Sequence, residues 1–140
     1  MRIRSRGRVR VSRSARLSAG ARVRAAPGAR VVLSPGAVVG PGARIEAVSG
    51  TVVVGADARL GERSIVVCHA GVTIGAGAVL GDWAVVSDVA PAFSDVERPV
   101  RLQAVVARPL VVGPRAVIGP HAAVGASVAT GREIAAYAVV

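Results

Sequence analysis

Few side chains of this chain could move a proton near neutral pH. The 140 residues include only two histidines, His69 and His121, and one cysteine, Cys68. Imidazole has the ordinary pKa closest to neutrality, so a histidine is the natural candidate for a general base. Proton transfer by this chain therefore depends on the elements that could position one of these rings beside a reacting group.

Those elements come from a six-residue repeat. Apolar residues recur every six positions, usually with an alanine two places earlier and often with a glycine directly after. A period of six fits neither an amphipathic helix nor an alternating strand, and a fixed short period is typical of a solenoid. The repeated unit occupies Ala15–Leu17, Ala21–Val23, Ala37–Val39, Ala43–Ile45, Ala58–Leu60, Ala78–Leu80, Ala84–Val86, Ala116–Ile118, Ala122–Val124 and Ala138–Val140.

Three such units are expected to close a triangular coil of about 18 residues, and successive coils to lie about 4.8 Å apart. A single unit is too short to bury its apolar face, so the stacking of coils must supply the core. We expect one domain over residues 1–140, with roughly six coils and a length of about 30 Å. The expected core positions are Val11, Leu17, Val23, Leu33, Val39, Ile45, Val54, Leu60, Cys68, Ile74, Leu80, Val86, Val112, Ile118 and Val124.

The repeat stops between Val86 and Val112, which predicts an excursion loop over about residues 88–109. Long excursions from a regular scaffold are where function is often located. His69 follows the inward-facing position of Cys68, so we expect it at a corner of the solenoid. If three repeat units make one coil, His69 stacks beneath Ser87, where the loop leaves, and becomes a candidate base. The alternative is a corner histidine that hydrogen-bonds a neighbouring turn.

The other histidine, His121, lies in a G-P-H-A turn, which indicates a surface position. The region 110–140, which contains it, is expected to form the C-terminal coils.

The formal net charge of +10 comes entirely from arginine, because the chain has no lysine. Arginines alternate with other residues from Arg2 to Arg10, which predicts a strand with one charged face in the Arg-rich first coil, residues 1–16. This face could be solvated and discourage edge pairing, or it could bind an anionic partner such as nucleic acid or a membrane surface. The scarcity of aromatic residues argues against recognition of single-stranded nucleic acid.

One cysteine allows no disulfide within the chain, which favours a reducing compartment, and we expect a cytoplasmic location. The first thirty residues contain many arginines and no apolar signal segment. Residues 64–81 carry no formal charge and are about long enough to span a membrane. Their glycines fall at turn positions of the repeat, so we interpret the stretch as β-coil and expect no transmembrane segment.

Two segments resemble a known family. Val85–Gln103 reads V-V-S-D-V-A-P-A-F-S-D-V-E-R-P-V-R-L-Q, and Val124–Val140 reads V-G-A-S-V-A-T-G-R-E-I-A-A-Y-A-V-V. With the repeats of the form [LIV]-G-x-x-[STAV]-x, they resemble the hexapeptide-repeat acyltransferases. Over residues 60–140 they are most similar to the sugar O-acetyltransferase branch that acts on maltose and galactosides. The family loop usually reads D-x-x-H-x-F-x-D and then P-[IV]-x-x-Q, and the matching residues are Asp88, Phe93, Asp95, Pro99, Val100 and Gln103.

The resemblance implies an all-β fold, a single-stranded left-handed parallel β-helix, although parallel crossovers in general are right-handed. It also implies a homotrimer with sites between subunits, acetyl-CoA as acyl donor, no metal, and a sugar or other small hydroxyl-bearing acceptor. The acceptor-binding residues that it implies are Asp88, Phe93, Asp95, Arg101 and Gln103. The residues that it implies for CoA are Ala126, Ser127 and Arg132.

The sequence departs from the family pattern at the residue that matters most for chemistry. The loop histidine that serves the family as general base aligns with Pro91, whose side chain accepts no proton. His69 is then the remaining candidate for the catalytic base, whereas Asp88 and Asp95 could orient a sugar or only hold the loop against Arg98 and Arg101. Family members also continue beyond the position of Val140, so we expect truncated or shortened C-terminal coils.

Three other functions are compatible with such a fold. The first is a non-catalytic β-helical trimer that has kept the scaffold and lost the chemistry. The second, a zinc-dependent carbonic anhydrase, needs three histidines at a shared interface, and this sequence contains two. The third, a polymerising β-helical cytoskeletal protein, is disfavoured by the long loop.

Overall fold

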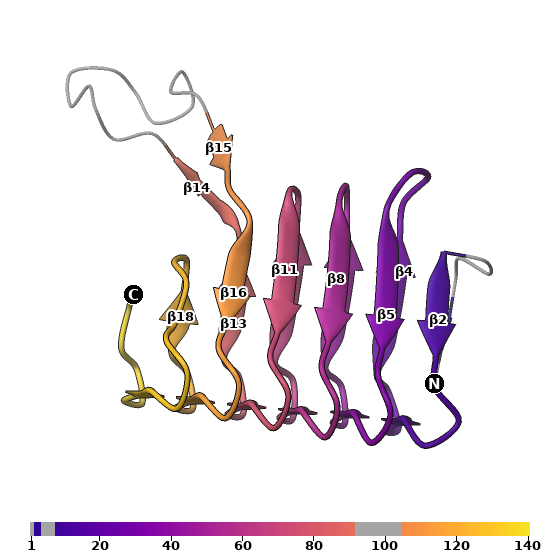
Figure 1. Ribbon diagram of the computed structural model, residues 1–140, viewed down its shortest axis with the longest axis horizontal. Helices are drawn as coiled ribbons and strands as arrows, with labels where there is room; N and C mark the ends of the chain where they lie inside the picture. Colours follow the sequence, from indigo (N-terminus) through magenta and orange to yellow (C-terminus); the bar gives the residue numbers. More distant parts are fainter. Residues whose placement is uncertain (1, 4–7, 92–104) are drawn as a thin grey trace.

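The chain folds into a three-sided parallel β-solenoid (Figure 1). The computed structural model describes residues 2–3, 8–91 and 105–140. Their regular structure is all β: three parallel sheets form the sides of the solenoid, and a short antiparallel pair projects from it. Within these ranges no helix is long and apolar enough to cross a membrane. The predicted all-β solenoid is therefore confirmed.

Each sheet takes one strand from every coil. Sheet A has the order β1-β4-β7-β10-β13-β18, sheet B the order β16-β11-β8-β5-β2, and sheet C the order β19-β17-β12-β9-β6-β3. The strands of sheet A are Arg2–Ile3, Arg22–Ala25, Arg44–Ala47, Ile65–Cys68, Val85–Ser87 and Ala123–Val124. In chain order, sheet B contains Val9–Val11, Arg30–Leu33, Thr51–Val54, Gly71–Ile74 and Leu110–Val112. Sheet C contains Arg16–Leu17, Val38–Val39, Arg59–Leu60, Val79–Leu80, Val117–Ile118 and Glu133–Ile134.

The core is a narrow column of alanine and branched aliphatic side chains inside the three sheets. All the expected core positions from Val23 to Val124 are buried. The first two positions differ: Leu17 is half-buried, and Val11 is 39% exposed. Both lie on strands at the end of their sheets, where only one neighbouring coil is paired with them. The repeat therefore predicted which side chains point inward. The inward positions of the first coil are less buried because no earlier coil packs against them.

The expected coil length is wrong, because each coil is longer than three six-residue units. Val23 pairs with Ile45, Ile45 with Val66, and Val66 with Val86, so every partner lies further along the chain than three units would place it. The difference arises at the edge between sheets A and B, where the turns comprise residues 26–29, 48–50 and 69–70. A residue added in such a turn leaves the inward-facing positions of the following strand unchanged, so the apolar pattern does not reveal it.

We call this edge, made by the turns 26–29, 48–50, 69–70 and 125–127, the A–B edge. The excursion leaves the solenoid here after β13 and returns at the first residue of β16, Leu110. Its stem is an antiparallel pair, β14 (Val89–Pro91) with β15 (Val105–Ala107), that extends beyond the upper edge of the solenoid in Figure 1. The interruption of the repeat therefore corresponds to a two-stranded stem on the A–B edge.

The Arg-rich start of the chain is not one strand. β1 pairs with β4 in sheet A, whereas β2 pairs with β5 in sheet B, so its two described strands lie on different sides of the solenoid. Alternation alone predicted a single strand because a two-residue period does not show where a short strand ends.

Candidate functional site

His69 and Asp88 meet on the A–B edge at the root of the excursion. Asp88 directly follows β13, and its buried carboxylate accepts three backbone hydrogen bonds from the turn of the preceding coil. The donors are the N–H groups of His69 (2.8 Å to Oδ1), Ala70 (2.7 Å to Oδ2) and Gly71 (2.8 Å to Oδ2). A carboxylate with three such donors is held in one orientation.

Asp88 takes the place of a backbone acceptor. In the two preceding coils the first N–H group of the A–B turn donates to a carbonyl of the next coil, from Ala26 to Ala47 and from Val48 to Cys68, both at 2.9 Å. At His69 the next coil is leaving the solenoid, and the Asp88 carboxylate accepts the corresponding N–H group instead. An aspartate at this position therefore closes the last regular turn before the excursion.

The same carboxylate lies beside the His69 ring. Nδ1 of His69 is 3.9 Å from Oδ1 of Asp88, is itself buried, and has no hydrogen-bond partner among the described residues. The His69 side chain as a whole is 37% exposed, whereas that of Asp88 is fully buried. One edge of the imidazole thus faces a fixed carboxylate and the rest of the ring is accessible. This arrangement can hold a proton on Nδ1 and leave Nε2 as a proton acceptor.

Cys68 is not suited to act as a nucleophile. Its thiol is buried in the core and donates to the carbonyl of Ser49 at 3.2 Å. Burial, and then the negative charge of Asp88, raise the pKa of Cys68 from 9.0 to about 11. The reactive form of cysteine is the thiolate, so this thiol is inert near neutral pH.

The expected pairing of His69 with Ser87 is wrong, because Ser87 pairs with Val67. The coil at this point is longer than three repeat units, which brings Asp88 to the His69 turn instead. The structure therefore places His69 at the root of the excursion, as the sequence predicted, with a different neighbour from the one expected.

The residues expected to bind CoA separate into two groups. Ala126 and Ser127 lie in the turn 125–127 on the A–B edge, the same edge as His69. Ser127 Oγ accepts a hydrogen bond of 3.0 Å from the N–H group of Val111, which holds the turn against sheet B. Arg132 is exposed and directly precedes β19 of sheet C, at the edge between sheets B and C. The structure thus brings two of the three to the His69 edge.

Much of the expected acceptor site lies outside the described residues. Of the residues expected to bind the acceptor, the structure describes Asp88. The others lie outside the described residues: Phe93, Asp95, Arg101 and Gln103. Pro91, the residue aligned with the family's catalytic histidine, lies in the stem strand β14 and pairs with Val105. Among the described parts of the chain, no group of three or more histidine, cysteine or acidic residues could hold a metal ion.

One group of residues was missed by sequence reasoning. At the edge between sheets C and A, the ring of His121 stacks between those of Trp83 and Tyr137, with centroids at 6.1 and 4.8 Å and planes within 4°. Arg63 extends the stack, with its guanidinium 5.4 Å from the Trp83 ring. These four residues share one corner position and a left-handed φ of 55–63°. His121 is thus a member of an exposed stack, remote in the fold from the A–B edge.

No protein-family model matches the chain, and no curated protein matches its sequence. A solved structure that aligns with it is that of AntD, an N-acyltransferase from Bacillus cereus in complex with dTDP and 3-hydroxybutyryl-CoA. The alignment covers 95% of this chain and 74% of that chain, with 14% identity and a TM-score of 0.49. We therefore infer function from the residues of this chain.

Proposed function

We propose that the protein is a CoA-dependent acyltransferase in which His69 is the general base. The observation that supports this most is the His69–Asp88 pair: a fixed, buried carboxylate faces the buried Nδ1, and the rest of the imidazole is accessible. The pair lies at the root of the excursion that resembles the active-site loop of the sugar O-acetyltransferases.

In the proposed reaction, Nε2 of His69 removes the proton of an acceptor hydroxyl while the hydroxyl oxygen attacks the thioester carbonyl. The carbon–sulfur bond then breaks, and the departing CoA thiolate takes the proton back from the imidazolium. Asp88 stabilises the transient positive charge on the ring and keeps Nδ1 protonated. The separation of 3.9 Å is longer than a hydrogen bond, so the ring must rotate slightly towards Asp88 when substrate binds.

The donor is proposed to be acetyl-CoA, with Ala126 and Ser127 beside the pantetheine arm on the A–B edge and Arg132 near a phosphate. The acceptor is proposed to be a sugar or another small hydroxyl compound. We also propose that three chains associate and that the reaction takes place in the cytoplasm, where the chain's single thiol would remain reduced.

The alternative function is a scaffold without catalysis. It is favoured by the three backbone N–H groups that Asp88 accepts, because they give this carboxylate a complete structural role without any substrate. It is also favoured by Pro91 in the position of the family's catalytic histidine.

Acetyl-CoA titration by calorimetry, combined with thiol release over a panel of hydroxyl acceptors, separates the two functions. We expect binding and turnover in the wild type and a loss of about 10²- to 10⁴-fold in kcat for His69→Gln. His121→Gln, at another edge of the solenoid, is the matched control and should retain activity. An absence of binding at millimolar acetyl-CoA would support the scaffold, and full activity of His69→Gln would exclude His69 as the base.

A further inference from the structure

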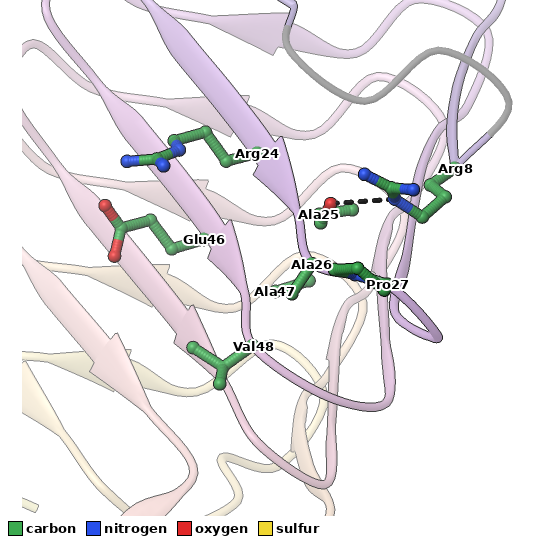
Figure 2. Close-up of a pocket in the computed structure, with 8 residues that line it drawn as sticks. All are labelled: Arg8, Arg24, Ala25, Ala26, Pro27, Glu46, Ala47 and Val48. Carbon is green, nitrogen blue, oxygen red and sulfur yellow. Dashed lines mark hydrogen bonds between the residues drawn. The ribbon is translucent and has the colours of Figure 1, made fainter.

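A pocket of about 470 Å³ lies on the A–B edge, towards the N-terminal coils from His69 (Figure 2). Its size is within the range of about 300–1,000 Å³ that is usual for small-molecule sites. Turns 26–29 and 48–50 border it, and turn 26–29 is the longest of this edge. The residues that line it are Arg8, Arg24, Ala25, Ala26, Pro27, Glu46, Ala47 and Val48.

The pocket is continuous with the turn that carries His69. The N–H group of Val48, which lines the pocket, donates to the carbonyl of Cys68 at 2.9 Å, and Ser49 Oγ donates to the carbonyl of His69. Val48 therefore lies one coil, about 4.8 Å, before His69 along the edge. A small molecule that occupies the pocket can reach the imidazole by spanning one or two coils.

The pocket carries two guanidinium groups on opposite sides. Arg8 Nε donates to the carbonyl of Ala25 at 2.9 Å, which fixes this side chain at the rim, as Figure 2 shows. Arg24 extends from β4 on the other side and is exposed, and its guanidinium points away from Arg8, on the side where Glu46 lies. Glu46 pairs in register with Arg24 on the next strand, yet among the residues that the structure describes no carboxylate lies within 4.0 Å of the Arg24 guanidinium. Arg24 thus retains its hydrogen-bonding capacity for a ligand.

We infer that the acceptor of the acyl transfer is an anion, a compound that carries a carboxylate or phosphate group as well as the hydroxyl. This inference rests on the proposed function. The exposed Arg24 side chain turns towards the pocket and binds the anionic group together with the terminal nitrogens of Arg8. Pro27 and Val48 contact the carbon skeleton of the ligand, and its hydroxyl extends along the edge to His69. Guanidinium groups suit this role because their donors match the paired oxygens of carboxylate and phosphate.

Binding of glucose 6-phosphate, glucuronate and glucose, measured by calorimetry without a donor, tests the inference. These probes supply the phosphate, the carboxylate and the neutral form of one skeleton. We expect at least one of the two anions to bind more tightly than glucose, and Arg24→Gln to weaken that binding by about 10- to 100-fold. Arg59→Gln is the matched control, because Arg59 is also an exposed strand arginine but lies on sheet C.

The outcomes separate this inference from the proposed function. Anion binding that persists in His69→Gln but falls in Arg24→Gln supports the pocket, and it does so even if no turnover is detected and the proposed function fails. Equal binding by wild type and Arg24→Gln would overturn the inference. An equal loss in Arg59→Gln would also overturn it, because the attraction would then come from the general positive charge. Arg8→Lys, which keeps the charge at the rim and removes the Nε donor, should weaken anion binding less than Arg24→Gln.

Discussion

At the scale of single residues, Asp88 joins the regular solenoid to its excursion. Its carboxylate satisfies three N–H groups of the His69 turn that would otherwise lose their acceptors where the chain departs. In Asp88→Asn one oxygen becomes an NH₂ group that must face at least one of these donors. We expect the free energy of unfolding to fall by about 1–3 kcal/mol, measured by chemical denaturation.

The control for this variant is Asp82→Asn. Asp82 is exposed and accepts one backbone bond, from Glu62 at 2.9 Å, so its replacement should change the free energy of unfolding by less than about 1 kcal/mol. Equal stability of Asp88→Asn and wild type would show that the buried carboxylate is not needed to close the turn.

Cys68 gives the stability of the protein a pH dependence in the alkaline range. Burial and the charge of Asp88 raise the pKa of its thiol from 9.0 to about 11, so the folded state holds this proton more strongly than the unfolded state. The resulting stabilisation is complete below about pH 9 and is lost as the pH rises towards about 11. Denaturant titrations should therefore show a steeper alkaline decline for wild type than for Cys68→Ala. The same alkaline decline of the free energy of unfolding in both proteins would contradict the assignment of this pH dependence to Cys68.

At the scale of secondary-structure elements, close contact between coils depends on glycine at one turn position. A Cβ added to Gly75 would lie 2.4 Å from the N atom of Pro114 and 2.7 Å from the carbonyl carbon of Gly113, both in the next coil. Backbone atoms cannot move away without opening the ladder, so Gly75→Ala should lower the free energy of unfolding by about 1–3 kcal/mol.

Gly125→Ala provides the comparison for the glycine variant. A Cβ there has the carbonyl oxygen of Val140 at 3.6 Å as its nearest contact, which is an ordinary van der Waals distance. Thermal denaturation should therefore show a clear decrease in Tm for Gly75→Ala and little change for Gly125→Ala. Similar Tm values for the two variants would mean that the coils separate easily at this turn.

The elements also show what the sequence could predict. The six-residue repeat identified the inward positions from Val23 to Val124 because the stacked coils bury the same repeat position. It could not give the coil length, because the A–B turns shorten from 26–29 to 69–70 without changing the core pattern. The role of Asp88 was hidden for a related reason: its partners are backbone N–H groups of another coil, which no side-chain pattern records.

At the scale of the whole molecule, charge is concentrated in the N-terminal half. Residues 1–63 contain thirteen of the 18 arginines and three of the eight acidic residues, whereas residues 64–140 contain five of each. The first half therefore carries the entire formal net charge of +10. Such a field concentrates anions around the N-terminal coils, and it falls with ionic strength. It favours anionic acceptors at the A–B edge, while the local geometry around Arg24 must supply the selectivity.

The outer surface of sheet B differs from that of sheet C. One outward row of sheet B contains Val32, Val53, Thr73 and Val111, in register across four coils without a charged side chain, and begins with Arg10 in the first coil. The corresponding row of sheet C is interrupted at a central strand by Arg59. An uncharged row on a flat sheet suits contact with another copy of the chain. If three chains associate through sheet B, each A–B edge lies at the border of a contact, which agrees with a site shared between subunits.

Sedimentation of two matched variants tests this assembly. Val53 on sheet B and Val79 on sheet C are both half-buried, outward-facing valines on central strands. We expect the wild type to sediment at about three times the chain mass of 14.0 kDa, Val53→Glu at the mass of one chain, and Val79→Glu as the wild type. Three carboxylates brought together in a desolvated contact would repel one another, which gives the first variant its effect. If Val79→Glu dissociates the assembly and Val53→Glu does not, the chains associate through sheet C instead of sheet B. If the wild type is a monomer, the chains do not associate, and His69 must act with residues of its own chain.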